Sequence, residues 1–125
     1  MTIKKARPLF LNLLQIRMPP GAIISFGHRI SGLLLVFAGP LLLYLLDLSL
    51  QSPQGFEQVA EMFEGVVPRV LLVLLGWLFF HHLLGGVRYL GIDVGLGVSR
   101  GAARRSAWMV AAGGLLLGVL VGVAL

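Results

Sequence analysis

The sequence has 125 residues, of which 58% are hydrophobic and 12% are charged, and its mean hydropathy is +0.95. A soluble domain of this size needs a mostly polar surface, so the composition excludes one and predicts a small all-α integral membrane protein. The chain has no cysteine, which excludes disulfides and cysteine-ligated iron–sulfur clusters, and its net charge of +5 is distributed as membrane topology requires rather than as a nucleic-acid surface.

The first 21 residues combine leucines with basic side chains and end at Pro19 and Pro20. Two successive prolines cannot lie inside a helix, so we expect the chain to turn there. Residues 1–21 are therefore predicted to be a short interfacial segment before the first span. The segment lacks a cleavage-like site and does not look like a transit peptide, which favours a multi-pass protein of the bacterial inner membrane.

Three apolar windows approach the length of about 20 residues that crosses a bilayer as a helix. We predict transmembrane helices over residues 22–50, 68–90 and 106–125, an outer loop with a short helix over 51–67, and an inner loop over 91–105. Pro40 is an expected kink in the first span. In the third span Gly114, Gly118 and Gly122 repeat every four residues, a spacing that lets two helix backbones approach closely.

Basic and acidic residues are segregated between the connections. The residues before the first span are basic: Lys4, Lys5, Arg7 and Arg17. Those around the second loop are also basic: Arg88, Arg100, Arg104 and Arg105. The first loop has only acidic residues: Glu57, Glu61 and Glu64. By the positive-inside rule the N-terminus and the second loop should be cytoplasmic, and the first loop periplasmic.

The start of the first span carries a polar patch, SFGHRISG. On a helix Ser25, His28, Arg29 and Gly32 fall at i, i+3, i+4 and i+7 and share one face, whereas Ser31 lies off it. Arginine and histidine could simply reach the lipid headgroups as an anchor. The ordered serine and histidine favour a binding site at the cytoplasmic edge of the membrane.

Two adjacent histidines, His81 and His82, lie in the second apolar span. A neutral imidazole tolerates burial and is the usual nitrogen ligand of haem iron. Adjacent helix positions point about 100° apart, so the two cannot ligate one metal together. His82 shares a face with Gly85, Gly86 and Tyr89, and this glycine strip would give a flat macrocycle room. For either histidine alone, a packing role is an equal alternative.

A haem with two histidine ligands would need a second one, and we expect it from a partner chain because His28 and His82 are not obviously placed across a haem plane. Arg29 and Arg88 both lie toward the cytoplasmic side, where a guanidinium would meet haem propionates or a quinone carbonyl. Asp93, just past the span, would orient an arginine or carry protons; a solvated loop carboxylate is the equal alternative.

These residues resemble the larger cytochrome b membrane-anchor subunits of bacterial succinate dehydrogenase, the respiratory complex II. The resemblance covers essentially the whole chain and rests on three elements: Arg7-Pro8 with Asn12-Leu13; Pro19 or Pro20 with Ala22, Ser25, His28-Arg29 and Ser31-Gly32; and His82, Gly86, Arg88 and Asp93.

The resemblance implies that this chain and a second small anchor hold an iron–sulfur subunit and a flavoprotein subunit on the membrane, passing electrons from succinate to ubiquinone. One haem b would lie between the anchors, each of which gives one axial histidine, and His82 matches the ligand from this chain. Ser25 and Arg29 match residues that line the ubiquinone pocket. His28 with Arg29 would reach toward the haem propionates, with Arg88 on the same side.

Tyr89 stands where many members of that family have histidine, so a propionate contact there would use a phenol. Tyr89 and Asp93 form the candidate proton path. No catalytic residue is expected in this chain alone, so enzyme activity would belong to the complex. Two alternatives stay open: the anchor of a quinol:fumarate reductase, and a haem-free structural anchor or small transporter subunit.

Overall fold

The computed structural model describes residues 17–124, so most of the expected interfacial segment, residues 1–21, lies outside the described residues. Four helices follow one another: α1 (Pro20–Gln51), α2 (Pro53–Met62), α3 (Val66–Asp93) and α4 (Arg100–Ala124). Of these, α1, α3 and α4 are long and apolar enough to cross a membrane. The expectation of an all-α protein with three spans is confirmed.

The helix starts follow local sequence signals. Pro20 occupies the first turn of α1, where its missing N–H is not needed, and the helix continues through Pro40. Ser52 caps α2, because its Oγ accepts a hydrogen bond from the backbone N–H of Gly55 at 3.0 Å. Pro68 lies in the first turn of α3. The short helix α2 thus lies within residues 51–67.

Helix boundaries differ from the expected ones by one to six residues, and the two largest differences lie on either side of the second loop. Helix α3 continues to Asp93 instead of ending at residue 90, and α4 begins at Arg100 instead of residue 106. Both helices extend past their apolar windows because charged side chains at helix ends can reach water or headgroups. The turn left between them is short, and Gly95 and Gly97 adopt φ angles of 84° and 69°, which glycine accepts without strain.

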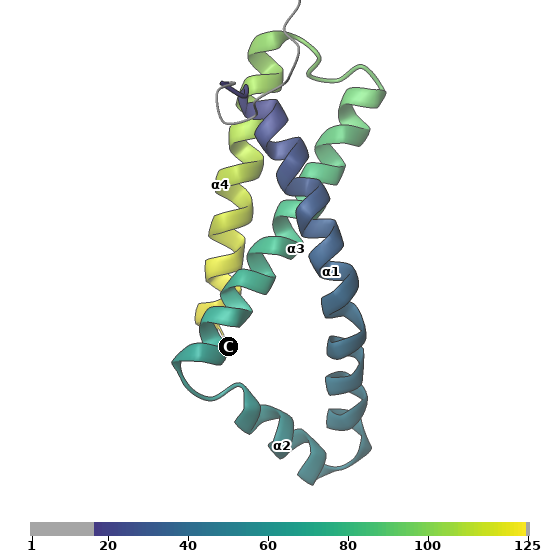
Figure 1. Cartoon of the computed structure of the whole chain (residues 1–125), viewed down its shortest axis with the longest axis vertical. Coiled ribbons are helices and arrows are strands. Elements are labelled where there is room, and N and C mark those ends of the chain that lie inside the picture. The colour runs from purple at the N-terminus through teal and green to yellow at the C-terminus, as the bar shows by residue number, and fades with distance from the viewer. Residues whose placement is uncertain (1–16, 125) are drawn as a thin grey trace, which may run out of the picture.

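Figure 1 shows how the helices are arranged. Helix α1 crosses α3, α4 runs beside α3, and α2 connects the ends of α1 and α3 farthest from the α3–α4 turn. The starts of α1 and α4 meet around a hollow lined by Pro20, Gly21, Arg100 and Arg104. The arginines of α4 therefore gather at one end of the bundle, and the glutamates of α2 lie at the other. This segregation agrees with the charge pattern behind the topology prediction.

The repeating glycines Gly114, Gly118 and Gly122 of α4 lie against α3. Gly114 and Gly118 are buried, and a Cβ atom at Gly118 would lie 2.5 Å from the backbone nitrogen of Trp77. A Cβ atom at Gly114 would lie 3.1 Å from Cα of His81. The expectation that this glycine repeat permits close backbone approach is confirmed.

Little of the molecule is buried within this chain. The buried hydrophobic residues are Ile24, Ala107 and Val110, whereas Phe37 on α1 is 73% exposed and Leu50 is 76% exposed. Side chains of this kind on a membrane helix contact lipid or another subunit. Within residues 17–124, most side chains in the second half of α1 are therefore exposed.

Candidate functional site

The crossing of α1 and α3 brings two histidines together. The imidazole rings of His28 and His82 stack with centroids 4.1 Å apart and planes 8° apart. The ring of Tyr89 meets His28 edge-on at 5.4 Å. Three of the polar side chains expected at the site are thus neighbours in the structure.

Each of these histidines lies against a glycine of the opposite helix. A Cβ atom at Gly32 of α1 would lie 2.7 Å from Cε1 of His82, and one at Gly85 of α3 would lie 2.9 Å from Cδ2 of His28. Real Cβ atoms essentially never come that close to another heavy atom. The two glycines therefore create the space in which the imidazoles stack.

The hydrogen bonds of His82 identify which ring nitrogen carries the proton. Its Nδ1 lies 3.0 Å from the backbone oxygen of His28 and 3.3 Å from Oγ of Ser31. The Ser31 hydroxyl itself donates to the same His28 oxygen at 2.9 Å. An unprotonated Nδ1 would direct its lone pair at that carbonyl oxygen, so Nδ1 must be the donor. The neutral ring then carries its free lone pair on Nε2.

This arrangement is the one that metal-ligating histidines use. One ring nitrogen donates to a backbone carbonyl, and this bond fixes both the tautomer and the ring orientation, while the other nitrogen is available to the metal. His82 therefore has the chemistry of a ligand. Among residues 17–124 no group of three or more His, Cys, Asp or Glu side chains is placed to hold a metal ion.

His28 cannot be the second ligand in this arrangement. Rings stacked in parallel planes direct their nitrogens alongside each other, not toward one point between them. In this structure the two rings therefore do not face each other across a common point, and the expectation of a second ligand from a partner chain stays a prediction.

The glycine strip beside His82 is not open in this chain. A Cβ atom at Gly85 would meet the His28 ring, and one at Gly86 would lie 3.5 Å from Nε2 of His28. The space expected for a macrocycle at this strip is occupied by His28 in this chain. His28 covers it because the crossing of α1 over α3 places that side chain directly on the glycines.

His81 lies in a different environment from His82. It is only 5% exposed and packs between Gly27 of α1 and Gly114 of α4, with its ring centroid 5.8 Å from that of Trp77. Neither ring nitrogen has a hydrogen-bond partner within the described part of the chain. His81 is therefore enclosed between two helices, whereas His82 has a hydrogen-bonded Nδ1.

The polar face of α1 divides at the crossing. His28 turns toward α3, Ser25 is half-buried, and Arg29 is exposed. Arg29 and Ser25 are one helical turn apart, so they remain on neighbouring surface at the edge of the crossing. Both side chains are thus accessible to a molecule or subunit outside this chain.

Arg88 of α3 is hydrogen-bonded to α4. Its Nε donates to Oγ of Ser106 at 3.0 Å, and its Nη2 donates to the backbone oxygen of Ala103 at 3.2 Å. The guanidinium carbon lies 5.2 Å from the ring centroid of Tyr89, whose buried hydroxyl has no partner among residues 17–124. Asp93 is exposed at the end of α3, which favours the solvated-carboxylate alternative over a role in orienting Arg88.

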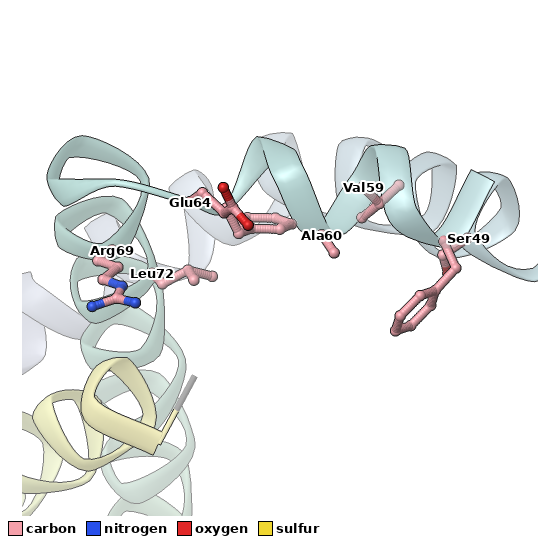
Figure 2. A pocket seen from close by; sticks show the side chains of 8 residues that line it. Ser49, Val59, Ala60, Glu64, Arg69 and Leu72 are labelled. Atoms are coloured by element: carbon pink, nitrogen blue, oxygen red, sulfur yellow. The ribbon is translucent and has the colours of Figure 1, made fainter. Parts of the chain in front are cut away.

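A second hollow, of about 640 Å³, lies at the far end of the bundle from the α3–α4 turn. In Figure 2 Leu72 on α3 extends toward α2, Arg69 lies along α3, and Glu64 lies between the two helices. Two charged side chains and several apolar ones line it, and no histidine does. It is therefore separate from the site at the helix crossing.

Ser31 is the residue that the sequence analysis did not assign to the site. A helical projection places it off the polar face, yet it is 1% exposed and contacts His82. Its position three residues after His28 is the available signal, since a serine hydroxyl commonly bonds the carbonyl one turn earlier.

The comparisons with known proteins agree with one another. The family model described as "Succinate dehydrogenase/Fumarate reductase transmembrane subunit" matches residues 3–121. A protein of Coxiella burnetii named "Succinate dehydrogenase cytochrome b556 subunit" is 35% identical, covering 94% of each chain. A protein of the same name from Paracoccus denitrificans is 32% identical over 91% of this chain and 88% of its own length. Another protein of this name, from Rickettsia conorii, is 33% identical over 78% of this chain and 76% of its own length.

Proposed function

Because this chain belongs to the family of succinate dehydrogenase/fumarate reductase transmembrane subunits, we propose that it is the haem b- and quinone-binding anchor of a bacterial succinate dehydrogenase. Its three apolar helices make it a multi-pass membrane protein, as its family requires. Electrons from succinate would reach ubiquinone through an iron–sulfur subunit docked on this anchor. The names of the relatives favour this function over a fumarate reductase.

The observation that carries the proposal is the hydrogen bonding of His82. Its Nδ1 is held by the His28 carbonyl, which leaves the lone pair of Nε2 for iron. A haem b bound here would supply one-electron chemistry. His82 would be the axial ligand from this chain, and a histidine of a second anchor subunit would be the other.

Tyr89 and Arg88 would bind the propionate groups of the haem. The buried Tyr89 hydroxyl has no acceptor within residues 17–124, and buried hydroxyls in folded proteins nearly always have one. A propionate would satisfy it, with Arg88 supplying the positive charge beside the same ring. His28 and Arg29 would approach the haem from α1.

Ser25 and Arg29 would bind the quinone. The exposed Arg29 guanidinium would donate to one quinone oxygen and stabilise negative charge as electrons arrive, an effect commonly worth about 3 kcal/mol in a dry site. Ser25 would donate a hydrogen bond to a carbonyl oxygen. Because Arg29 is exposed in this chain, neighbouring subunits must cover it to exclude water and strengthen this interaction. Tyr89 and Asp93 would lie on the route of the protons.

The proposal is tested on the complex purified through a tag on this chain. We expect an iron–sulfur subunit, a flavoprotein and a second small membrane protein to co-purify, and the reduced-minus-oxidised visible spectrum to show b-type haem. Co-purified ubiquinone would support a succinate dehydrogenase, and menaquinone a fumarate reductase. A complex without b-type absorption would contradict the haem assignment, and isolation of the chain without these partners would contradict the anchor role.

A further inference from the structure

We propose that Ser31 is a positioning residue for the haem ligand: its hydroxyl holds the imidazole of His82 in the tautomer and rotation that direct Nε2 at the iron. This inference rests on the proposed function, because it requires His82 to be the ligand. It concerns a side chain to which the sequence resemblance gave no role.

The contacts of Ser31 carry the inference. Its side chain is 1% exposed, the most completely buried polar side chain among the described residues. Its Oγ lies 2.9 Å from the His28 backbone oxygen and 3.3 Å from Nδ1 of His82. The three atoms form a closed triangle, in which the His82 N–H faces two oxygens and the serine hydroxyl faces the carbonyl.

The distances assign the roles within the triangle. The His28 carbonyl, at 3.0 Å, is the main acceptor for the His82 N–H. Ser31, at 3.3 Å, is a weaker second acceptor, and its own O–H donates to the carbonyl. A rotation of the imidazole would break both contacts of Nδ1 at once. The ring is thus held at its N–H by two oxygens, against its face by His28 and at its edge by Gly32.

Another serine on α1 shows that the local bond alone is not the reason for this geometry. Ser49 donates to the backbone oxygen of Leu46 at 2.7 Å, the same bond to the carbonyl three residues earlier. Ser49 is partly exposed and does not contact a histidine. Only Ser31 joins this local bond to a ring on another helix, so Ser49 is a matched control.

The expected consequence concerns the cofactor rather than the fold. Partners that orient a metal-ligating histidine typically change metal affinity by about 10- to 100-fold when removed. Ser31→Ala removes the second acceptor and leaves space for the ring to rotate, while the carbonyl bond remains. We therefore expect haem to leave the complex about tenfold faster, and the ferric low-spin electron paramagnetic resonance signal, which reports the orientation of axial imidazoles, to shift or broaden.

The experiment uses the whole complex with Ser31→Ala, Ser31→Thr and Ser49→Ala, and transfers haem to an excess of apomyoglobin. Ser31→Thr keeps the hydroxyl and should retain the wild-type resonance signal, and Ser49→Ala should match the wild type in both measurements. If the alanine variant does not assemble, Ser31→Cys tests the same point, because it keeps the volume with a much weaker hydrogen-bonding group. Wild-type release rate and resonance signal in the assembled alanine or cysteine variant would overturn the inference.

Failure of this inference is distinguishable from failure of the proposed function. If His82→Leu abolishes the low-spin haem signal but Ser31 variants are silent, His82 is the ligand and Ser31 does not position it. If His82→Leu leaves the signal unchanged, the ligand assignment itself fails, and the role of Ser31 fails with it.

Discussion

The imidazoles of His28 and His82 stack at 4.1 Å between their centroids although 54 positions separate them in the sequence. The contact exists because Gly32 and Gly85 remove the side chains that would otherwise keep the rings apart. The same crossing brings the His28 carbonyl to Nδ1 of His82. One helix contact therefore both positions the candidate ligand and defines its tautomer.

We predict that Gly32→Ala displaces His82. The added methyl group would lie 2.7 Å from Cε1 of the ring, and overpacking of this kind costs about 1–3 kcal/mol. The thermal stability of the complex should fall and its haem spectrum should change.

Gly39→Ala is the matched control, because a Cβ atom at Gly39 on the same helix meets nothing within 4 Å. It should be neutral or stabilise by about 0.5–1 kcal/mol, since alanine is the better helix former. Equal behaviour of the two variants would show that Gly32 does not make room for the ring.

Gly118→Ala should separate α3 from α4. Its Cβ atom would lie 2.5 Å from a backbone atom of Trp77, which cannot move aside as a side chain can. We expect a reduced yield of assembled complex and a lower melting temperature. Gly101→Ala, at a position of the same helix with open space around it, should leave both near the wild-type values. The account of α3–α4 packing is wrong if Gly118→Ala behaves like Gly101→Ala.

Arg29→Leu should impair quinone reduction without impairing the dehydrogenase reaction. Loss of a donor worth about 3 kcal/mol corresponds to a decrease in kcat of about 100-fold. Ser25→Ala should have a smaller effect in the same direction. Succinate oxidation by an artificial acceptor that bypasses the membrane anchor should stay near normal.

Arg69→Leu is the control for the arginine substitution, because Arg69 is also exposed but lines the hollow at the far end of the bundle. Its quinone reductase activity should match the wild type. The pocket assignment is contradicted if Arg29→Leu is as active as Arg69→Leu.

Arg88→Leu and Ser106→Ala separate two roles of one arginine. Ser106→Ala removes a hydrogen bond between α3 and α4 and should lower stability by about 1 kcal/mol while the haem potential stays constant. Arg88→Leu also removes a positive charge beside the haem edge. A nearby positive charge stabilises the reduced haem relative to the oxidised haem, because the reduced haem carries less positive charge. Its loss should therefore lower the midpoint potential. Potentiometric titration checks this, and an unchanged potential in Arg88→Leu would leave Arg88 as a helix link only.

Much of the fold follows from sequence patterns alone. Apolar length gives the three spans, the proline pair gives the start of α1, and Pro68 falls in the first turn of α3. The helix ends were less predictable, because Asp93 and Arg100 continue helices beyond the apolar windows into a zone where charges reach water. Hydropathy marks the membrane core and not the ends of the hydrogen-bonded helix.

The sequence predicts residue types for the site but not their contacts. The resemblance favours His82 over His81 through its register with Gly86, Arg88 and Asp93, and this choice stays a prediction. The stacking of His28 on the glycine strip and the role of Ser31 depend on the register between α1 and α3. A helical projection of one helix contains no information on that register, so Ser31 was placed off the polar face.

The most direct test of the central claim is the low-spin haem signal in His82→Leu and His81→Leu complexes, measured by visible difference spectroscopy and electron paramagnetic resonance. The two substitutions are chemically identical and adjacent. We expect His82→Leu to lose the low-spin b-type signal, whether or not haem stays bound, and His81→Leu to keep it. A wild-type signal in His82→Leu, or its loss in an assembled His81→Leu complex, would contradict the assignment of His82 as the haem ligand.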